Sequence, residues 1–217
     1  GSKEKMFRLL QGDVGSGKTI VSIISALNAI KAGYQVALMA PTEILATQHY
    51  KFILENFNIY CNAEILTGKT EYKKRKKILN DLLNNKIDIL VGTHSLFQEK
   101  INYFNLGLII IDEQHKFGVR QRKKLSDKGG KDCDVLVMSA TPIPRTMMMT
   151  IYGDMDISLI KSKPRNRRPI KTYSKNETKI NDVINFIKSE IIKKNQVFWV
   201  CPLIKESKKL DHQSTTE

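Results

Sequence analysis

The sequence predicts an α/β fold of the doubly wound class, in which a mostly parallel sheet carries helices on both faces. Three observations indicate this fold. Short apolar runs of strand length recur along the chain, longer segments of helical periodicity separate them, and a glycine-rich loop joins the first apolar run to the first helical segment. Because ligands of this fold class bind at the carboxyl ends of the strands, the residues that follow the apolar runs are candidates for a site.

The predicted strands are apolar runs that are each as long as one buried strand. They are residues 7–10, 36–40, 87–91, 106–111 and 135–138. Three predicted helices lie between them, over residues 18–31, 43–57 and 71–83. Gly33 follows the first helix as a stop signal. Strands that alternate with helices in this way favour a parallel sheet.

A break in composition divides the chain before its last quarter. Residues 161–169 read Lys-Ser-Lys-Pro-Arg-Asn-Arg-Arg-Pro, and their two prolines disfavour both helix and central strand, so we predict a linker there. Residues 6–160 then form the first domain, and residues 170–217 form the truncated start of a second α/β domain. The predicted elements of this second part are a short strand over 170–173, a helix with apolar residues from 180 to 191, and a strand over 197–201.

From its first residues, we expect the sequence to begin inside a longer protein. Residues 1–5 have the look of a tag-cleavage scar and tail, because Gly1-Ser2 precedes a first methionine at Met6. The 217 residues suffice for one full α/β domain and a remnant, but not for two domains of typical length.

The balance of charge is strongly basic, with 36 Lys and Arg against 22 Asp and Glu, a net charge of +14 and a pI of about 9.6. This balance is typical of a polyanion binder, but an AT-rich coding sequence produces the same excess of lysine, so both interpretations stay open. The cysteines, Cys61, Cys133 and Cys201, have no CxxC spacing, which argues against a disulfide framework or a zinc site. No apolar run approaches the roughly 20 residues of a membrane span, so we expect a cytoplasmic protein.

One segment, Gly12-Asp13-Val14-Gly15-Ser16-Gly17-Lys18-Thr19, fits the phosphate-binding pattern GxxxxGK[ST]. It lies between a predicted strand and a predicted helix, and this context disfavours the alternative of a chance glycine-rich turn. Glycines let such a loop fold round phosphate oxygens so that backbone N–H groups face the negative charge. We expect Lys18 to reach the terminal phosphates of a nucleotide and Thr19 to bind Mg²⁺. The predicted cofactor contacts are Gly12, Gly15, Ser16, Gly17, Lys18 and Thr19.

An acidic pair, Asp112-Glu113, follows the fully apolar run Ile109-Ile110-Ile111. In a fold with a phosphate-binding loop, this is the place where an aspartate binds Mg²⁺ from the end of a strand, which is the role that we predict for Asp112. Glu113 is then positioned to polarise the water that attacks the γ-phosphate. The simpler alternative is that both acids cap a following helix.

The motifs together resemble those of the superfamily-2 DNA helicases. Asp112-Glu113-Gln114-His115 matches the DExH box of these helicases, and Ser139-Ala140-Thr141 matches their Ser-Ala-Thr motif, in the expected order. Residues 41–46, 92–94 and 140–146 are similar to those of the branch-migrating helicases in particular, and this resemblance spans almost the whole chain. The nearest rival is the transcription-repair coupling factor, which shares Gly-Asp-Val-Gly at 12–15 and the run 141–146 but usually has glutamate where Gln114 stands, so Gln114 and the segment 41–44 favour the branch-migrating helicases.

The resemblance implies a RecA-like P-loop NTPase fold and an ATP hydrolase that uses ATP and Mg²⁺. It further implies a translocase on double-stranded DNA that remodels branched DNA, namely stalled forks and Holliday junctions, in recombination and repair. Residues of three loops would contact the sugar-phosphate backbone, which positions the protein without reading sequence. These residues are Pro41, Thr42, Thr67, Gly68, Thr93 and His94. For His94, ordering of its own loop is an equally good interpretation.

Four further residues take a role in the coupling of hydrolysis to DNA binding if the resemblance holds. His115 would act in catalysis and transmit the hydrolysis step, and Gln114, Ser139 and Thr141 would link the nucleotide state to the DNA-facing motif.

The basic run from Lys73 to Lys77 lies on a predicted helix whose apolar residues face inward. For this run a solvated face is the favoured interpretation.

Parts of the family pattern are missing from the sequence. The adenine-contacting glutamine motif would precede residue 1, and the arginine fingers of the second motor lobe and the N-terminal wedge domain would lie outside the 217 residues. Because an arginine finger contributes roughly 10³ to 10⁵ in rate, we expect this polypeptide to bind ATP with little turnover. A nucleotide-binding or DNA-binding module without hydrolysis is an alternative, and a P-loop kinase is disfavoured by the DExH and Ser-Ala-Thr motifs.

Overall fold

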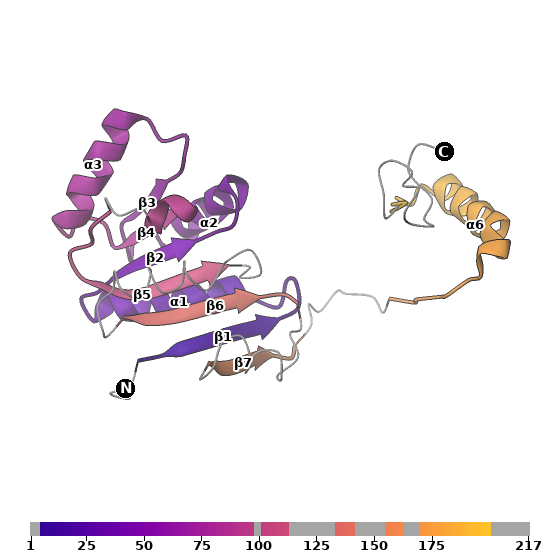
Figure 1. Ribbon diagram of the computed structural model, residues 1–217, viewed down its shortest axis with the longest axis horizontal. Coiled ribbons are helices and arrows are strands. Elements are labelled where there is room, and N and C mark those ends of the chain that lie inside the picture. The colour runs from indigo at the N-terminus through magenta and orange to yellow at the C-terminus, as the bar shows by residue number, and fades with distance from the viewer. Residues whose placement is uncertain (1–4, 98–100, 113–132, 142–154, 163–169, 201–217) are drawn as a thin grey trace, which may run out of the picture. The chain divides into compact units, whose positions relative to one another are not determined.

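The structure is a computed structural model of the 217-residue chain (Figure 1). The residues that it describes are 5–97, 101–112, 133–141, 155–162 and 170–200. The chain divides into two compact units, residues 1–167 and 168–217. The predicted linker lies mostly outside the described residues, so the predicted domain boundary stays a prediction.

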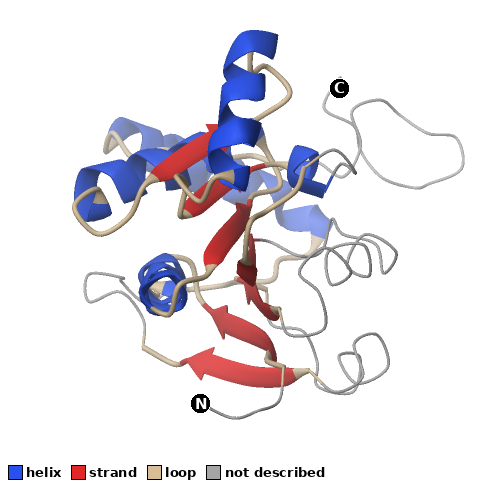
Figure 2. Cartoon of the chain, turned by 90° about the vertical axis from the view of Figure 1, so that its left-hand side faces the viewer, coloured by secondary structure: helices blue, strands red, loops and turns tan. Residues whose placement is uncertain are grey.

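The first unit is built on a seven-stranded sheet with the order β3-β4-β2-β5-β6-β1-β7. Its strands are β1 (Phe7–Gly12), β2 (Gln35–Met39), β3 (Ala63–Leu66), β4 (Ile89–Gly92), β5 (Leu106–Asp112), β6 (Asp134–Ser139) and β7 (Asp156–Ile160). Every pair of neighbouring strands is parallel, and Figure 2 shows the sheet as a twisted ribbon of strands. The predicted α/β fold with a parallel sheet is confirmed.

Helices cover both faces of this sheet. They are α1 (Lys18–Lys31), α2 (Glu43–Phe57), α3 (Tyr72–Leu83) and the short 3₁₀ helix η1 (His94–Phe97). Side chains of β2 alternate between two apolar clusters: Val36 and Leu38 pack with α1 and α2, whereas Ala37 and Met39 pack with α3. Because strand side chains point to opposite faces in turn, α1 and α2 lie on one face and α3 lies on the other.

The helix boundaries follow local signals in the sequence. Helices α1 and α2 have the predicted bounds, and α3 begins one residue later than predicted. The hydroxyl of Thr42 caps α2 by accepting from the backbone N–H of Leu45 at 3.3 Å. Gly33 follows α1 with a φ of 87°, a left-handed conformation that glycine adopts without strain.

The sequence prediction missed β3 and β7. Both are the edge strands of the sheet, and an edge strand needs fewer apolar residues because one side of it faces solvent. In β3 only Leu66 is buried, and in β7 no residue is buried. Neither strand therefore carries the continuous apolar run that identified the five central strands.

The second unit contains a 3₁₀ turn, η3 (Glu177–Lys179), and one helix, α6 (Ile180–Ile192). The predicted helix is confirmed. The two predicted strands are wrong over the residues that can be compared, because 170–173 and 197–200 form no strand and Cys201 lies outside the described residues. A strand requires a partner strand, and the described part of this unit offers none. None of the helices in the described ranges is long and apolar enough to cross a membrane.

Candidate nucleotide-binding site

The carboxyl edge of the sheet brings the predicted motifs together. Because all the strands are parallel, their carboxyl ends lie along one edge, where ligands of such sheets bind. The phosphate-binding loop follows β1, Asp112 ends β5 and Ser139 ends β6. The loops predicted to contact DNA follow β2, β3 and β4 at the same edge. Motifs that lie up to 130 residues apart in the chain are neighbours in the fold.

The phosphate-binding loop has the backbone conformation that its glycines permit. Gly15 and Gly17 have φ angles of 77° and 96°, in the left-handed region that disfavours other residues. The N–H of Ser16 donates to the carbonyl oxygen of Asp13 at 3.1 Å, which closes the turn. Helix α1 begins directly afterwards at Lys18, so its free N–H groups and the positive end of its dipole face the loop.

The Lys18 side chain is held across this loop. Its ammonium nitrogen donates to the carbonyl oxygen of Gly12 at 2.8 Å and to that of Asp13 at 3.0 Å. An ammonium group has three donors, so these bonds orient the side chain and leave one donor for an anion. This geometry fits a phosphate ligand.

Gly12 is required for space and not for its backbone angles. A Cβ atom at this position would lie 2.5 Å from the hydroxyl oxygen of Ser16 and 3.1 Å from Cβ of Ile160 in β7. The Ser16 hydroxyl itself is buried and has no hydrogen-bond partner among the described residues. Because an unpaired buried polar group is costly, it fits a site where a ligand oxygen completes the pairing.

Asp112 has a partner that the sequence prediction missed. Its Oδ2 lies 2.7 Å from Nε2 of His49, a residue of α2 that is 8% exposed. Counted for the side chains alone, the exposed fraction is 14% for Asp112 and 10% for His49, so both are largely buried. The imidazole therefore holds one carboxylate oxygen. No sequence pattern identified His49, because its role depends on α2 packing beside the end of β5.

Three predicted site residues, Glu113, Gln114 and His115, lie outside the described residues.

The two predicted Mg²⁺ ligands come from different elements: Thr19 lies in the first turn of α1 and Asp112 at the end of β5. Strand β6 separates β1 from β5, so the two sides of the site are about 10 Å apart at the usual strand spacing. Within the described ranges, no group of three His, Cys, Asp or Glu residues could hold a metal ion without further ligands.

The Ser-Ala-Thr motif forms a closed turn at the end of β6. The buried Ser139 hydroxyl lies 3.1 Å from the Thr141 hydroxyl and accepts from the Thr141 N–H at 3.2 Å. The side chain of Gln11 donates to the carbonyl oxygen of Thr141 at 3.0 Å. Gln11 directly precedes Gly12, so this bond ties the motif to the strand that carries the phosphate-binding loop. The sequence prediction also missed Gln11.

The loops that follow β2 and β3 are joined to each other. Lys69 forms an ion pair of 3.3 Å with Glu43, the first residue of α2. The N–H of Thr67 donates to the Thr70 hydroxyl at 3.0 Å and folds the second loop into a turn. The predicted contact residues in these loops are accessible: Thr42 and Gly68 are exposed, and Pro41 and Thr67 are half-buried.

The loop after β4 is packed closely against β3. A Cβ atom on Gly92 would lie 2.2 Å from the carbonyl oxygen of Leu66, so only glycine fits between the strands here. The Ser95 hydroxyl donates to the same carbonyl at 3.0 Å. Thr93 is half-buried, and the backbone of His94 begins η1. The structure thus brings all three predicted loops to one edge.

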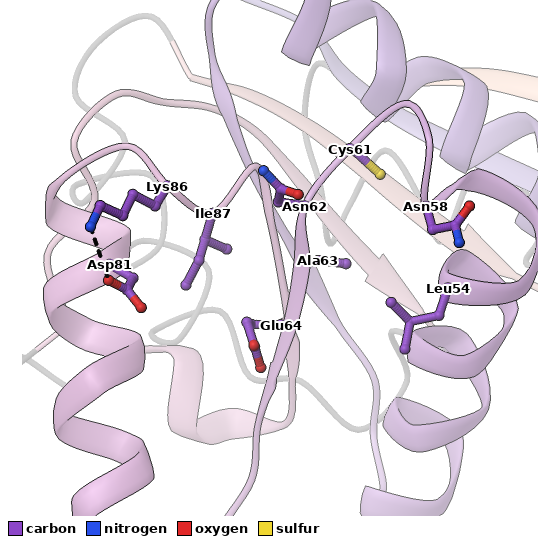
Figure 3. A pocket seen from close by; sticks show the side chains of 9 residues that line it. All are labelled: Leu54, Asn58, Cys61, Asn62, Ala63, Glu64, Asp81, Lys86 and Ile87. Atoms are coloured by element: carbon purple, nitrogen blue, oxygen red, sulfur yellow. Dashed lines mark ion pairs between the residues drawn. The ribbon is translucent and has the colours of Figure 1, made fainter.

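A pocket of about 310 Å³ lies at the opposite ends of β3 and β4 (Figure 3). Its lining includes Asn62, Glu64 and Ile87, together with residues from the last turns of α2 and α3. One carboxylate oxygen of Glu64 is buried without a hydrogen-bond partner among the described residues. Because the pocket lies at the amino ends of the strands, it is separate from the phosphate-binding loop.

The sequence pattern of the DEAD/DEAH box helicase family matches residues 2–150. The chain belongs to this family. The chain is 46% identical over 217 residues to "ATP-dependent DNA helicase RecG" of Thermotoga maritima. The alignment covers 100% of this chain and 28% of that protein. RecG of Aquifex aeolicus is 50% identical over 214 residues, with 98% of this chain and 27% of that protein covered. The predicted resemblance to superfamily-2 helicases is confirmed.

Solved structures give the same result. RecG bound to a three-way DNA junction is 42% identical and aligns with a TM-score of 0.73, covering 88% of this chain and 26% of that one. The Pyrococcus furiosus Hef helicase domain, at 21% identity and a TM-score of 0.53 over 74% of this chain and 36% of that one, shows likeness of fold alone. The helicase chain thus spans between a quarter and a third of the length of the curated relatives described above. The sequence analysis favoured the branch-migrating helicases over the transcription-repair coupling factor, and the similarity to RecG, a branch-migrating helicase, agrees with that choice.

Proposed function

We propose that this chain is the ATP-binding motor lobe of an ATP-dependent double-stranded DNA translocase that remodels branched DNA. Stalled forks and Holliday junctions in recombination and repair are the expected substrates. The observation that carries the proposal is the shared carboxyl edge, where the phosphate-binding loop, Asp112 and the Ser139–Thr141 turn lie at the same edge as the three loops predicted to contact DNA. Similarity to RecG, which has been solved on a three-way DNA junction, supports the choice of branched DNA.

ATP and Mg²⁺ are the proposed cofactors. The free N–H groups in the first turn of α1 and the third donor of Lys18 face the loop and would bind phosphate oxygens. Thr19 and Asp112 would hold Mg²⁺, which supplies neutralisation of phosphate charge. The contact from His49 orients the Asp112 carboxylate, in the manner of a residue that supports a metal ligand.

Hydrolysis is assigned to residues after Asp112. Glu113 would accept a proton from the attacking water, since a carboxylate is the base available there at neutral pH. His115, Gln114 and the Ser139–Thr141 turn would report the nucleotide state to the DNA-facing loops. The bond from Gln11 to Thr141 is a direct path for this coupling, because it starts one residue before the phosphate-binding loop.

The proposed partners are double-stranded and branched DNA, the second motor lobe and an N-terminal wedge domain. The arginine finger that would stabilise charge on the transferred phosphoryl group belongs to the second lobe. A polypeptide of these 217 residues should therefore bind ATP and hydrolyse it slowly. The relatives are bacterial DNA helicases, so we propose a cytoplasmic site of action.

The test is nucleotide binding and steady-state ATP hydrolysis, with and without junction DNA. It compares this polypeptide with one extended through the second lobe of the same protein. DNA-stimulated turnover in the extended protein that Glu113→Gln abolishes supports the proposal, and Lys18→Ala should remove ATP binding from both polypeptides. ATP binding without hydrolysis in the extended protein would show a binding module, and failure of both to bind ATP would overturn the assignment of the loop.

A further inference from the structure

Helix α3 carries four exposed lysines, Lys73, Lys74, Lys76 and Lys77. The inner face of the same helix is defined by Ile78 and Leu82, which are buried in the core. Three of the lysines, Lys73, Lys76 and Lys77, therefore lie on the outer face, which is turned away from the sheet, and Lys74 lies at the flank of the helix, one turn before Ile78. They occupy the first two turns of α3.

The position of α3 places these lysines beside the predicted DNA-contact loops. Helix α3 follows β3 through the loop that contains Thr67 and Gly68, and this loop begins at the carboxyl edge of the sheet (Figure 1). Lys73 follows Thr70 by three positions, a span of at most about 10 Å. The lysines thus continue directly from the accessible loop after β3, which the Lys69–Glu43 ion pair joins to the loop after β2.

This arrangement of charge opposes the stability of the helix. Lys73 and Lys77 are four residues apart, and like charges at this spacing repel each other on a helix surface. The N-terminus of a helix is the positive end of its dipole; Glu71 lies at the N-cap of α3, but the first turn after it contains Lys73 and Lys74 and no acidic residue. None of the four lysines forms an ion pair with the residues that the structure describes. A bound polyanion would relieve all of these repulsions at once.

We propose that the outer face of α3 binds the phosphate backbone of the same DNA duplex that the neighbouring loops contact. This inference rests on the proposed function and extends its DNA track beyond the helicase motifs. Lysine contacts to phosphates carry no sequence information, which suits a motor that moves along any sequence. A duplex is favoured over an acidic protein because the lysines are continuous with the loops at the carboxyl edge.

The test compares two variants that each remove two positive charges. The first is Lys73→Gln with Lys77→Gln. The control for DNA binding is Lys31→Gln with Lys86→Gln, because these exposed lysines lie at the C-terminus of α1 and before β4, at the opposite edge of the sheet. Lys86 pairs with Asp81 at 3.9 Å, so stability is compared with the parent chain and not with this control. Binding of the full 217-residue chain to a fluorescent DNA duplex and to a three-way junction is measured across a range of salt concentrations.

The α3 variant should bind duplex DNA at least about 10-fold more weakly than the control at 0.1 M salt. The slope of log K against log salt should fall by about 1.8, since each phosphate contact contributes about 0.9. Its urea midpoint and its affinity for a fluorescent ATP analogue should not fall, because the substitutions remove repulsion and lie outside the nucleotide site. Weaker DNA binding without loss of stability is a result that a merely solvated face cannot produce.

Equal slopes for the α3 variant and the control would overturn the inference and leave the proposed function standing. Loss of affinity for a single-stranded RNA with unchanged affinity for the duplex would also overturn it. If the polypeptide extended through the second lobe binds no duplex at low salt while it still binds the ATP analogue, the DNA-translocase function fails together with the inference.

Discussion

Replacement of His49 by alanine tests the contact beneath the candidate Mg²⁺ site. The imidazole Nε2 lies 2.7 Å from Oδ2 of Asp112, and His49 is 8% exposed. The variant removes the hydrogen-bond partner of a carboxylate that is itself largely buried. Asp112 ends β5 in the centre of the sheet, and its side chain is only 14% exposed, so little solvent is available to replace the lost partner.

The size of the effect follows from the type of bond. A hydrogen bond to a charged group contributes about 1.5–3 kcal/mol, and the loss of one partner leaves the other unsatisfied. For a domain of this size, each kcal/mol shifts the melting temperature by about 2–4 °C. We therefore expect His49→Ala to lower the free energy of unfolding by about 2 kcal/mol and the melting temperature by roughly 4–8 °C.

Urea unfolding and thermal melting measure this change, with Gln48→Ala as the control. Gln48 is the exposed neighbour on the same helix, so its substitution reports the effect of alanine in α2 alone. The Mg²⁺ concentration needed for ATP binding should also rise by roughly 10-fold in His49→Ala, as for residues that orient metal ligands. A free energy of unfolding for His49→Ala within about 0.5 kcal/mol of that for Gln48→Ala would refute this reasoning.

Three further outcomes are expected. Gly92→Ala should lower the free energy of unfolding by about 3 kcal/mol in urea titration, because the added Cβ would lie 2.2 Å from a backbone oxygen of Leu66. An unchanged urea midpoint would contradict the close packing of β4 against β3. Gln11→Ala removes the bond to Thr141, which is worth about 1 kcal/mol, so it should lower DNA-stimulated turnover roughly fivefold in the protein extended through the second lobe. The affinity for ATP should not change. A fivefold loss of ATP affinity would argue against a role of this bond in coupling. Burial raises the pKa of the Cys61 thiol from 9.0 to about 11, so the unfolded chain loses this proton first and stability should fall as pH rises from about 9 to about 11. Cys61→Ala should flatten that fall in pH-dependent melting, and an identical pH profile would refute the cause.

The central strands and the first three helices were predictable because their residues obey local rules. Continuous apolar runs marked the five strands that are covered on both sides by other strands, and helical periodicity marked the helices, with Gly33 as the stop signal of the first. The edge strands β3 and β7 escaped prediction because solvent on one side relaxes the need for apolar residues. The predicted strands over 170–173 and 197–200 were wrong because apolar character alone does not supply a partner strand.

The sequence by itself determined the chemistry of the nucleotide loop and the family. Spacing carries that information: eight consecutive residues, Gly12 to Thr19, form the loop, and an acidic pair after an apolar run marks the end of a strand. Only the tertiary structure decided the strand order, the contact of His49 with Asp112, and the bond from Gln11 to Thr141. These contacts join residues 63 and 130 positions apart, and such pairs arise only when the sheet and its helices pack together. Local spacing cannot specify them, because nothing in either residue's own neighbourhood identifies its partner.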